Sequence, residues 1–314
     1  MDAKENKLEC VPAMHASSEN TAEYLVGWTK CGTCVWAIGN TGKLTIRPEC
    51  GNIGTLDDWS GEIKGENLPW TVEGAPWASK ECAPIITSVE FQGVIHAKTC
   101  EGMFRGCTNI ISLDFANLYT IEVKSFELMF AQCSSLERIN SLEHLDTSWA
   151  TTMRCMFLDC SKLSSINVTN FDTHLVHDMS ATFSYCQSLT TLDLSKWDTS
   201  NVRSMGFMFF ACKALKWVDL STFDTSHARR MDALFAECSS LPFLDLSSFQ
   251  FSDDTIVGNM LRGCESLRAL ALPDGIDFEE SGFGLKGAWL CATDEGISDV
   301  SEGDVSKAGS YLRL

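Results

Sequence analysis

The sequence predicts a repeat solenoid, an elongated body in which short units of one length stack on one another. Four 26-residue segments, each beginning with methionine, follow one another without a gap from Met153 to Ile256. Within them, phenylalanine and cysteine recur at the same step, at Phe157, Phe183, Phe209 and Phe235 and at Cys160, Cys186, Cys212 and Cys238. Leucines spaced L-x-x-L-x-L that recur at such a fixed, short period are typical of a leucine-rich repeat.

The composition is that of a folded protein and disfavours polyanionic partners. Of the 314 residues, 45% are hydrophobic and 21% are charged, which argues against disorder. The net charge of −18 disfavours binding to nucleic acid and to anionic membranes. Because no apolar run approaches the roughly 20 residues that span a bilayer, we expect no membrane insertion.

The N-terminal third lacks the repeat register. Residues 1–20 are polar and contain no apolar stretch of a signal peptide, so we expect a flexible tail. We interpret residues 21–98, which hold most of the tryptophans, as a β-rich cap that shields the first repeat from water. Alternating apolar residues at 34–38 and 43–47 predict two strands joined by a turn at 39–42, and residues 85–91 predict a further strand.

The repeat region is expected over residues 99–273, as about seven coils. One extra residue enters after Asn140 and lengthens the step between two coils, and the pattern ends near Pro273. We interpret residues 274–314 as a C-terminal cap. A cysteine that recurs once per coil is best explained as a small buried hydrophobe; this column holds Cys107, Cys133, Cys160, Cys186, Cys212, Cys238 and Cys264.

Each coil is expected to contribute one short strand and one aromatic ring to the core. In the segment Thr191–Ser195, alternation turns Leu192 and Leu194 inward. Stacked coils would pair these strands into one continuous parallel sheet. The phenylalanines would fill the other side of the core as a ladder of stacked rings.

Two columns rich in aspartate leave alternatives open. The Asp-Thr corner at Asp172, Asp198 and Asp224 suits either calcium binding or capping of the backbone, and capping is favoured. In the second column, on the outward face of the strands, stacked like charges should repel. Either hydrogen bonds or raised pKa values would relieve that repulsion; this column holds Asp114, Asn140, Asn167, Asp193, Asp219 and Asp245.

The sequence contains no catalytic constellation. The pair Cys31 and Cys34 lacks the second ligand pair of a zinc site and the βαβ context of a redox motif. The six histidines form no metalloprotease or triad-like pattern, and nucleophile-elbow, phosphate-loop and dinucleotide motifs are absent. We therefore expect a protein that is not an enzyme and that needs neither cofactor nor metal.

A ligand face is expected where the outward strand positions vary. Trp217 and Phe243 are neighbours in this column, exposed by alternation, and such aromatics anchor interfaces or stack on sugars unless a cap or loop covers them. A basic column at His177, Arg203 and Arg229, beside Arg230, is a second candidate, for which a solvated loop face is favoured. The candidate ligand-binding residues are Arg138, Thr191, Trp217, Asp219, Phe243 and Asp245.

The coil MSATFSYCQSLTTLDLSKWDTSNVRSM resembles those of the BspA-like leucine-rich-repeat surface proteins of bacteria. The resemblance covers about residues 100–273, and the upstream segments CGTCVW and GKLTIRP resemble the stretch that often precedes such repeats. It implies a secreted or cell-surface adhesin that binds host matrix proteins or other bacteria, although this chain shows neither a signal peptide nor an anchor. We expect a protein ligand on the strand face, with a carbohydrate-binding module that uses Trp217 and Phe243 as the alternative.

Overall fold

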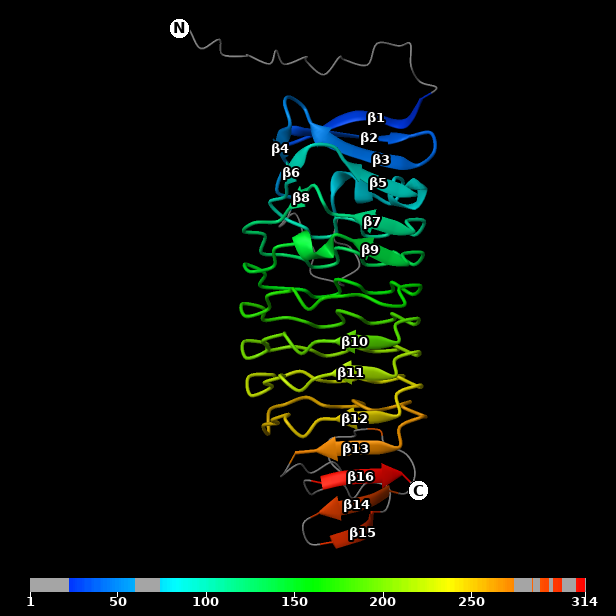
Figure 1. Cartoon of the computed structure of the whole chain (residues 1–314), viewed down its shortest axis with the longest axis vertical. Helices are drawn as coiled ribbons and strands as arrows, with labels where there is room; N and C mark the ends of the chain where they lie inside the picture. Colours follow the sequence, from blue (N-terminus) through cyan, green and yellow to red (C-terminus); the bar gives the residue numbers. More distant parts are fainter. Residues whose placement is uncertain are drawn as a thin grey trace.

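The chain forms an elongated stack of short β-strands and turns (Figure 1). The computed structural model describes residues 23–59, 74–273 and Gly284, and the backbone of three further strands near the C-terminus. Within these residues the protein is mostly strand and turn, with three short 3-10 helices and no closed sheet. The predicted tail at 1–20 lies outside the described residues, as does much of the predicted C-terminal cap.

The first layers are built from two sheets that contact the repeats directly. One sheet has the order β1 (Tyr24–Cys31), β2 (Cys34–Gly39), β3 (Lys43–Pro48), β5 (Ser88–Phe91). The other is parallel and contains β4 (Ile53–Thr55), β6 (Val94–His96), β8 (Leu118–Tyr119). Since β8 belongs to the first coil, the boundary that we expect near residue 98 is spanned by backbone hydrogen bonds, such as Ala97 N to Tyr119 O at 2.9 Å.

The predicted hairpin is confirmed, and the predicted strand at 85–91 is only partly right. β2 and β3 pair in antiparallel fashion around a turn in which Gly42 donates to the carbonyl of Gly39. Pro84, however, lies in a 3-10 helix, η2 (Ala83–Ile85), which follows the similar helix η1 (Pro76–Ala78). Because proline has a fixed φ and no N–H, the chain turns there before it becomes extended at β5.

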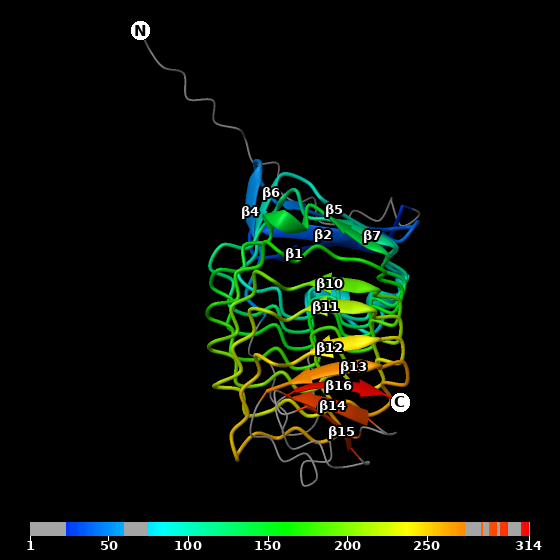
Figure 2. The ribbon, with the colours of Figure 1, turned by 60° about the horizontal axis from the view of Figure 1, so that its bottom comes forward.

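The strands of the repeats lie in register, one above another (Figures 1 and 2). They are β7 (Ser112–Asp114), β9 (Arg138–Asn140), β10 (Thr191–Asp193), β11 (Trp217–Asp219), β12 (Phe243–Asp245), β13 (Ala269–Leu272). β13 is extended in antiparallel fashion by β16 (Gly309–Arg313), beyond which lie β14 (Trp289–Thr293) and β15 (Gly296–Val300). Leu192 and Leu194 are buried, as alternation predicts.

The prediction of one continuous parallel sheet is wrong, because the ladder breaks twice. β10 pairs with β11 and β12 with β13, but β11 and β12 belong to different sheets. The reason lies at Pro242: Lys216, its equivalent one repeat earlier, donates its N–H to Thr190 at 2.8 Å, whereas proline has no N–H to donate. Between β9 and β10, the lengthened step includes Ser141 at φ 54° and the 3-10 helix η3 (Leu142–His144), and residues 164–167 form no strand.

The most regular ladder runs instead along the segments that contain the methionine, phenylalanine and cysteine columns. We call each of these a turn segment; Met205–Cys212 is one example. In it, alternate N–H groups donate to carbonyls of the next repeat at 2.8–2.9 Å, and those of Met208, Phe210 and Cys212 donate within the same repeat. Every second peptide thus joins neighbouring repeats. The parallel bridges just before these segments connect Ser125, Thr152, Asp178, Ser204, Arg230 and Ile256.

Each turn segment contains two residues in the left-handed region, four positions apart. The first column holds Gly102, Leu128, Cys155, Ala181, Phe207, Ala233 and Asn259, and the second holds Gly106, Gln132, Asp159, Tyr185, Ala211, Glu237 and Gly263. For residues other than glycine this conformation costs roughly 1–2 kcal/mol. The stacking pattern of hydrogen bonds therefore imposes backbone strain on every repeat except the first, in which both positions are glycine.

Glycine should be tolerated, or preferred, in these columns. Ala233 has φ 52°, whereas Ala236, three residues later and also buried, does not have a positive φ. We expect Ala233→Gly to raise the free energy of unfolding by up to about 1 kcal/mol through release of strain. The matched Ala236→Gly should lower it by about 1–2 kcal/mol, through chain entropy and a lost buried methyl. Urea denaturation measures both, and equal losses would contradict the assignment of strain.

The predicted ladder of phenylalanine rings is confirmed. Phe104, Phe130, Phe157, Phe183, Phe209 and Phe235 are buried, with neighbouring centroids 5.0–6.1 Å apart and rings within 13° of parallel. The cysteine column is also buried and consists of free thiols. Each thiol from Cys133 onward donates to the phenylalanine carbonyl one repeat back, as Cys212 Sγ does to Phe183 O at 3.1 Å. Burial raises the pKa of these thiols, so they stay protonated.

The Asp-Thr corners hold the backbone, as the capping alternative predicts. Asp198 Oδ1 accepts the N–H of Ser200 at 2.9 Å and its hydroxyl at 2.6 Å. The buried Thr173 hydroxyl donates to the carbonyl of Asp198 and accepts from its N–H, both at 2.8 Å. Threonines 147, 199 and 225 make the same pair of bonds to the next repeat. The corner thus joins repeats through buried hydroxyls.

Candidate functional site

The strand face brings three of the candidate residues together in consecutive repeats. Thr191 pairs in register with Trp217, and Phe243 begins the strand of the next repeat. The Trp217 side chain is 46% exposed and that of Phe243 is 50% exposed, so no described cap or loop covers either one. Arg138 is exposed in the same column but lies two repeats before Thr191, about 10 Å away at the usual strand spacing.

The two candidate aspartates have a structural task as well as an outward position. Asp219 accepts the N–H of Ser221, and Asp245 accepts the N–H and the hydroxyl of Ser247, all through Oδ1. In the same column, hydrogen bonds from Ser195 hold the pKa of Asp193 below its usual value. At Asp193, hydrogen bonding rather than a raised pKa therefore accommodates the stacked charge.

The basic column lies on exposed backbone corners, away from the aromatic residues of the strand face. His177, Arg203 and Arg229 are all exposed. Arg230 forms an ion pair with Asp232 at 3.2 Å. The backbone carbonyls of His177 and Arg203 each accept the N–H of the equivalent residue in the next repeat, so this column is part of the stacking ladder.

The pair Cys31 and Cys34 lies where β1 turns into β2. Both thiols are buried and free. Burial, together with the negative charges of Cys31 and Asp57, raises the pKa of Cys34 to about 12. Because the thiolate is the nucleophile and the metal ligand, these thiols are poorly suited to redox chemistry. Within residues 23–59 and 74–273, no group of three or more His, Cys, Asp or Glu side chains is arranged to hold a metal ion.

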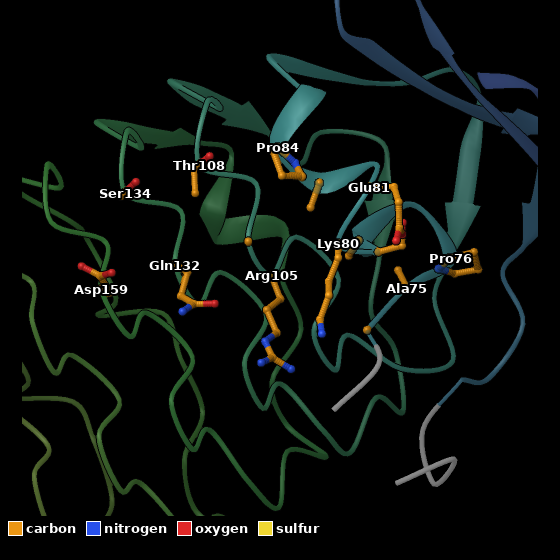
Figure 3. A pocket seen from close by; sticks show the side chains of 15 residues that line it. Ala75, Pro76, Lys80, Glu81, Pro84, Arg105, Thr108, Gln132, Ser134 and Asp159 are labelled. Carbon is orange, nitrogen blue, oxygen red and sulfur yellow. The ribbon is translucent and has the colours of Figure 1, made fainter. Parts of the chain in front are cut away.

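A hollow of about 970 Å³ lies between residues 74–84 and the first three turn segments (Figure 3). Lys80 and Arg105 project into it, and Gln132 and Asp159 line its other end. Both of the latter occupy left-handed positions of successive turn segments. Nothing in the sequence pattern pointed to this hollow, because residues 74–84 lie outside the repeat register.

The turn segments also present aromatic side chains that the sequence analysis missed. Tyr185 and Phe207 are 42% and 40% exposed, and both have φ 60°. The sequence does contain one indication of these positions. Glycine occurs in the same two columns, at Gly102, Gly106 and Gly263, and indicates a backbone conformation that favours residues without a side chain.

The fold and its faces define an all-β repeat protein with aromatic residues on its surface. The chain matches the family model described as "Mycoplasma protein of unknown function, DUF285" over residues 98–191 and 160–271. The two matches together span more than half of the chain, and the protein belongs to this family. No protein of curated function matches it.

Two solved structures are similar at a low level. One is a leucine-rich cell surface protein from Faecalibacterium prausnitzii A2-165, with 13% identity, a TM-score of 0.31 and coverage of 88% of this chain and 59% of that one. The other is a leucine-rich repeat protein from Eubacterium ventriosum ATCC 27560, with 16% identity, a TM-score of 0.28 and coverage of 80% and 78%. This chain thus spans about three-fifths of the first protein. Among its described residues, no helix has the length and apolar character needed to cross a bilayer.

Proposed function

We propose that the chain is a leucine-rich-repeat solenoid that binds a protein ligand on its strand face and carries out no catalysis. The observation that carries this proposal is the exposure of Trp217 and Phe243 on neighbouring repeats. Tryptophan is enriched among the few residues that dominate the energy of protein interfaces. Large side chains held half-exposed on adjacent strands are suited to that role.

The remaining candidate residues lie along the same strand face as this aromatic centre. Thr191 lies on one side of Trp217, and Arg138 lies further along the same column. Asp219 and Asp245 use Oδ1 for their own turns, which leaves Oδ2 of each for a ligand. An apolar centre with a polar rim is the common anatomy of a protein interface.

The resemblance to BspA-like surface proteins extends the proposal to the location of the protein and to the kind of ligand that it binds. We propose a secreted or cell-surface adhesin that recognises host matrix proteins or the surface of other bacteria. In this proposal residues 21–98 cap the solenoid of residues 99–273, and residues 274–314 close its other end. The backbone pairing of β13 with β16 supports such a closure.

The alternative is a carbohydrate-binding module on the same face, in which Trp217 and Phe243 stack on sugar rings. The same exposed aromatics favour it. Binding to a panel of immobilised matrix proteins and to a glycan array separates the two functions.

The test is the double variant Trp217→Ala/Phe243→Ala of the full chain. We expect it to weaken binding to the matrix-protein ligand at least about 30-fold, since an interface hot spot contributes about 2 kcal/mol or more. Trp149→Ala is the matched control, because Trp149 is 49% exposed but lies outside the strand column. Surface plasmon resonance measures the affinities, and unchanged binding of the double variant would rule out the strand face.

A further inference from the structure

Three aromatic side chains gather on the turn segments, away from the strand column. The ring of Phe210 contacts Tyr185 of the preceding repeat at 5.2 Å and Phe207 of its own repeat at 5.7 Å. Both contacts are edge-to-face, with interplanar angles of 72° and 67°. We call these residues the turn-face cluster. Phe210 is half-buried, whereas the other two rings present about two-fifths of their surface to solvent.

The fold does not require aromatic residues at these positions. Tyr185 and Phe207 both lie in the left-handed region, which is costly for bulky side chains. Other repeats place glycine or alanine in the same two columns, at Gly102, Gly106, Ala181, Ala211, Ala233 and Gly263. The left-handed conformation belongs to the stacking of the repeats, but a large exposed side chain there adds to its cost, which glycine would avoid. The aromatic identity of the cluster is therefore best explained by a ligand.

Polar groups without partners lie beside the rings. Asp159 precedes Tyr185 in the second left-handed column, and its N–H donates to Ser184 O at 2.8 Å. Gln187 and Lys213 each lie two residues after the second left-handed position, in two successive repeats. A hydrogen bond from Ala214 N to Gln187 O joins these two repeats there. In the described part of the chain, no hydrogen bond or ion pair engages the side chains of these three residues or the Tyr185 hydroxyl.

The charges around the cluster balance. Asp159 and Lys213 contribute one negative and one positive charge, and the nearby Arg230 and Arg262 are paired with Asp232 and Glu237. A basic peptide would meet the ammonium of Lys213, and a polyanion would meet a chain of net charge −18. A neutral ligand with apolar faces and hydroxyl groups fits better: its C–H faces stack on the rings, and its hydroxyls bind the carboxylate, amide and ammonium.

We propose that the turn-face cluster is a binding site for a neutral glycan, independent of the protein-binding strand face. Tyr185 and Phe207 are the stacking residues, and Asp159, Gln187 and Lys213 supply hydrogen bonds. Asp159 also lines the hollow of Figure 3, so a glycan chain longer than one unit has a surface along which to continue. A protein with both sites holds a polysaccharide and a protein ligand on different segments of the same repeats.

The experiment is native gel electrophoresis of the full chain in gels that contain a soluble neutral polysaccharide. The probes are a β-glucan, a xylan, a galactomannan and an α-glucan. The key variant is Tyr185→Gly/Phe207→Gly, which removes both rings and relieves the left-handed strain, so it should stay folded. Trp149→Ala is the control, because Trp149 is 49% exposed and belongs neither to the strand column nor to the turn-face cluster. Trp217→Ala/Phe243→Ala tests the strand face separately.

We expect at least one polysaccharide to retard the wild-type chain and the Trp149→Ala control equally. The glycine variant should bind that polysaccharide at least about tenfold more weakly, with a melting temperature equal to or above that of the wild type. Absence of retardation by all four probes overturns the proposal, as does retardation of the glycine variant like that of the wild type. Loss of retardation only in the strand-face variant overturns it too, since it assigns glycan binding to Trp217 and Phe243. A cluster-dependent retardation by polylysine alone would instead assign a cationic peptide to the site.

Discussion

Phe209→Ala is expected to lower the free energy of unfolding by about 3–5 kcal/mol. The ring is fully buried and lies between those of Phe183, at 6.0 Å, and Phe235, at 5.0 Å. Its removal leaves a cavity inside a column of stacked rings. The neighbouring repeats cannot collapse to fill this cavity, because backbone hydrogen bonds fix their spacing, as between Phe209 N and Leu234 O at 2.9 Å. Two stacking contacts are lost in addition, each worth about 0.5–1.5 kcal/mol beyond buried area.

The control for this substitution is Phe243→Ala, in which the same side chain is removed from a position that is 50% exposed. We expect it to cost less than about 1 kcal/mol, as surface changes usually do. Urea denaturation followed by circular dichroism measures both variants. A similar loss in the two would contradict the placement of Phe209 in the core.

Thr199→Val is expected to lower the free energy of unfolding by about 2–4 kcal/mol, because it leaves two partly buried backbone groups of Asp224 unsatisfied. The hydroxyl of Thr199 is buried, donates to the carbonyl of Asp224 and accepts from the N–H of Asp224, both at 2.9 Å. Valine fills nearly the same volume but leaves both backbone groups without this partner. A buried group left unsatisfied costs about 1–3 kcal/mol. The loss arises at the corner, where each repeat is joined to the next.

Thr199→Ser separates the hydroxyl from the methyl group. Serine keeps both hydrogen bonds and removes one buried methyl, so we expect a loss of only about 1 kcal/mol. Thermal and urea unfolding of the two variants give the comparison. If valine were no more destabilising than serine, the hydroxyl would not join the repeats as we describe.

Much of the interior could be predicted from the sequence, because each core residue packs against the equivalent residue of the neighbouring repeats. The 26-residue step alone places Phe157, Phe183 and Phe209 in one row, and alternation alone turns Leu192 inward. The capping role of Asp198 could also be predicted, since aspartate and serine two residues apart bond to their own backbone. These features depend on contacts that are local or that repeat without change.

The features that could not be predicted depend on how one repeat meets a different neighbour. Pro242 interrupts the sheet because the strand beside it needs an N–H that proline lacks, and the periodic pattern contains no such information. The left-handed columns arise because alternate peptides point along the stack and bond to the next repeat. The residue types in these columns vary, so the sequence pattern did not predict the backbone strain at Tyr185 and Phe207. The hollow beside Asp159 needs residues 74–84, which belong to no repeat.

The linear sequence therefore specifies the period, the core columns and the outward positions, because a residue that recurs at the fixed step is buried or exposed in the same way in each unit. The folded chain adds the hydrogen bonds between repeats, the positions where they fail, and the grouping of Tyr185 with Phe207 and Phe210. Burial is set by the position of a residue within its own unit. Pairing and surface clusters are set by the units above and below, whose side chains differ from one repeat to the next.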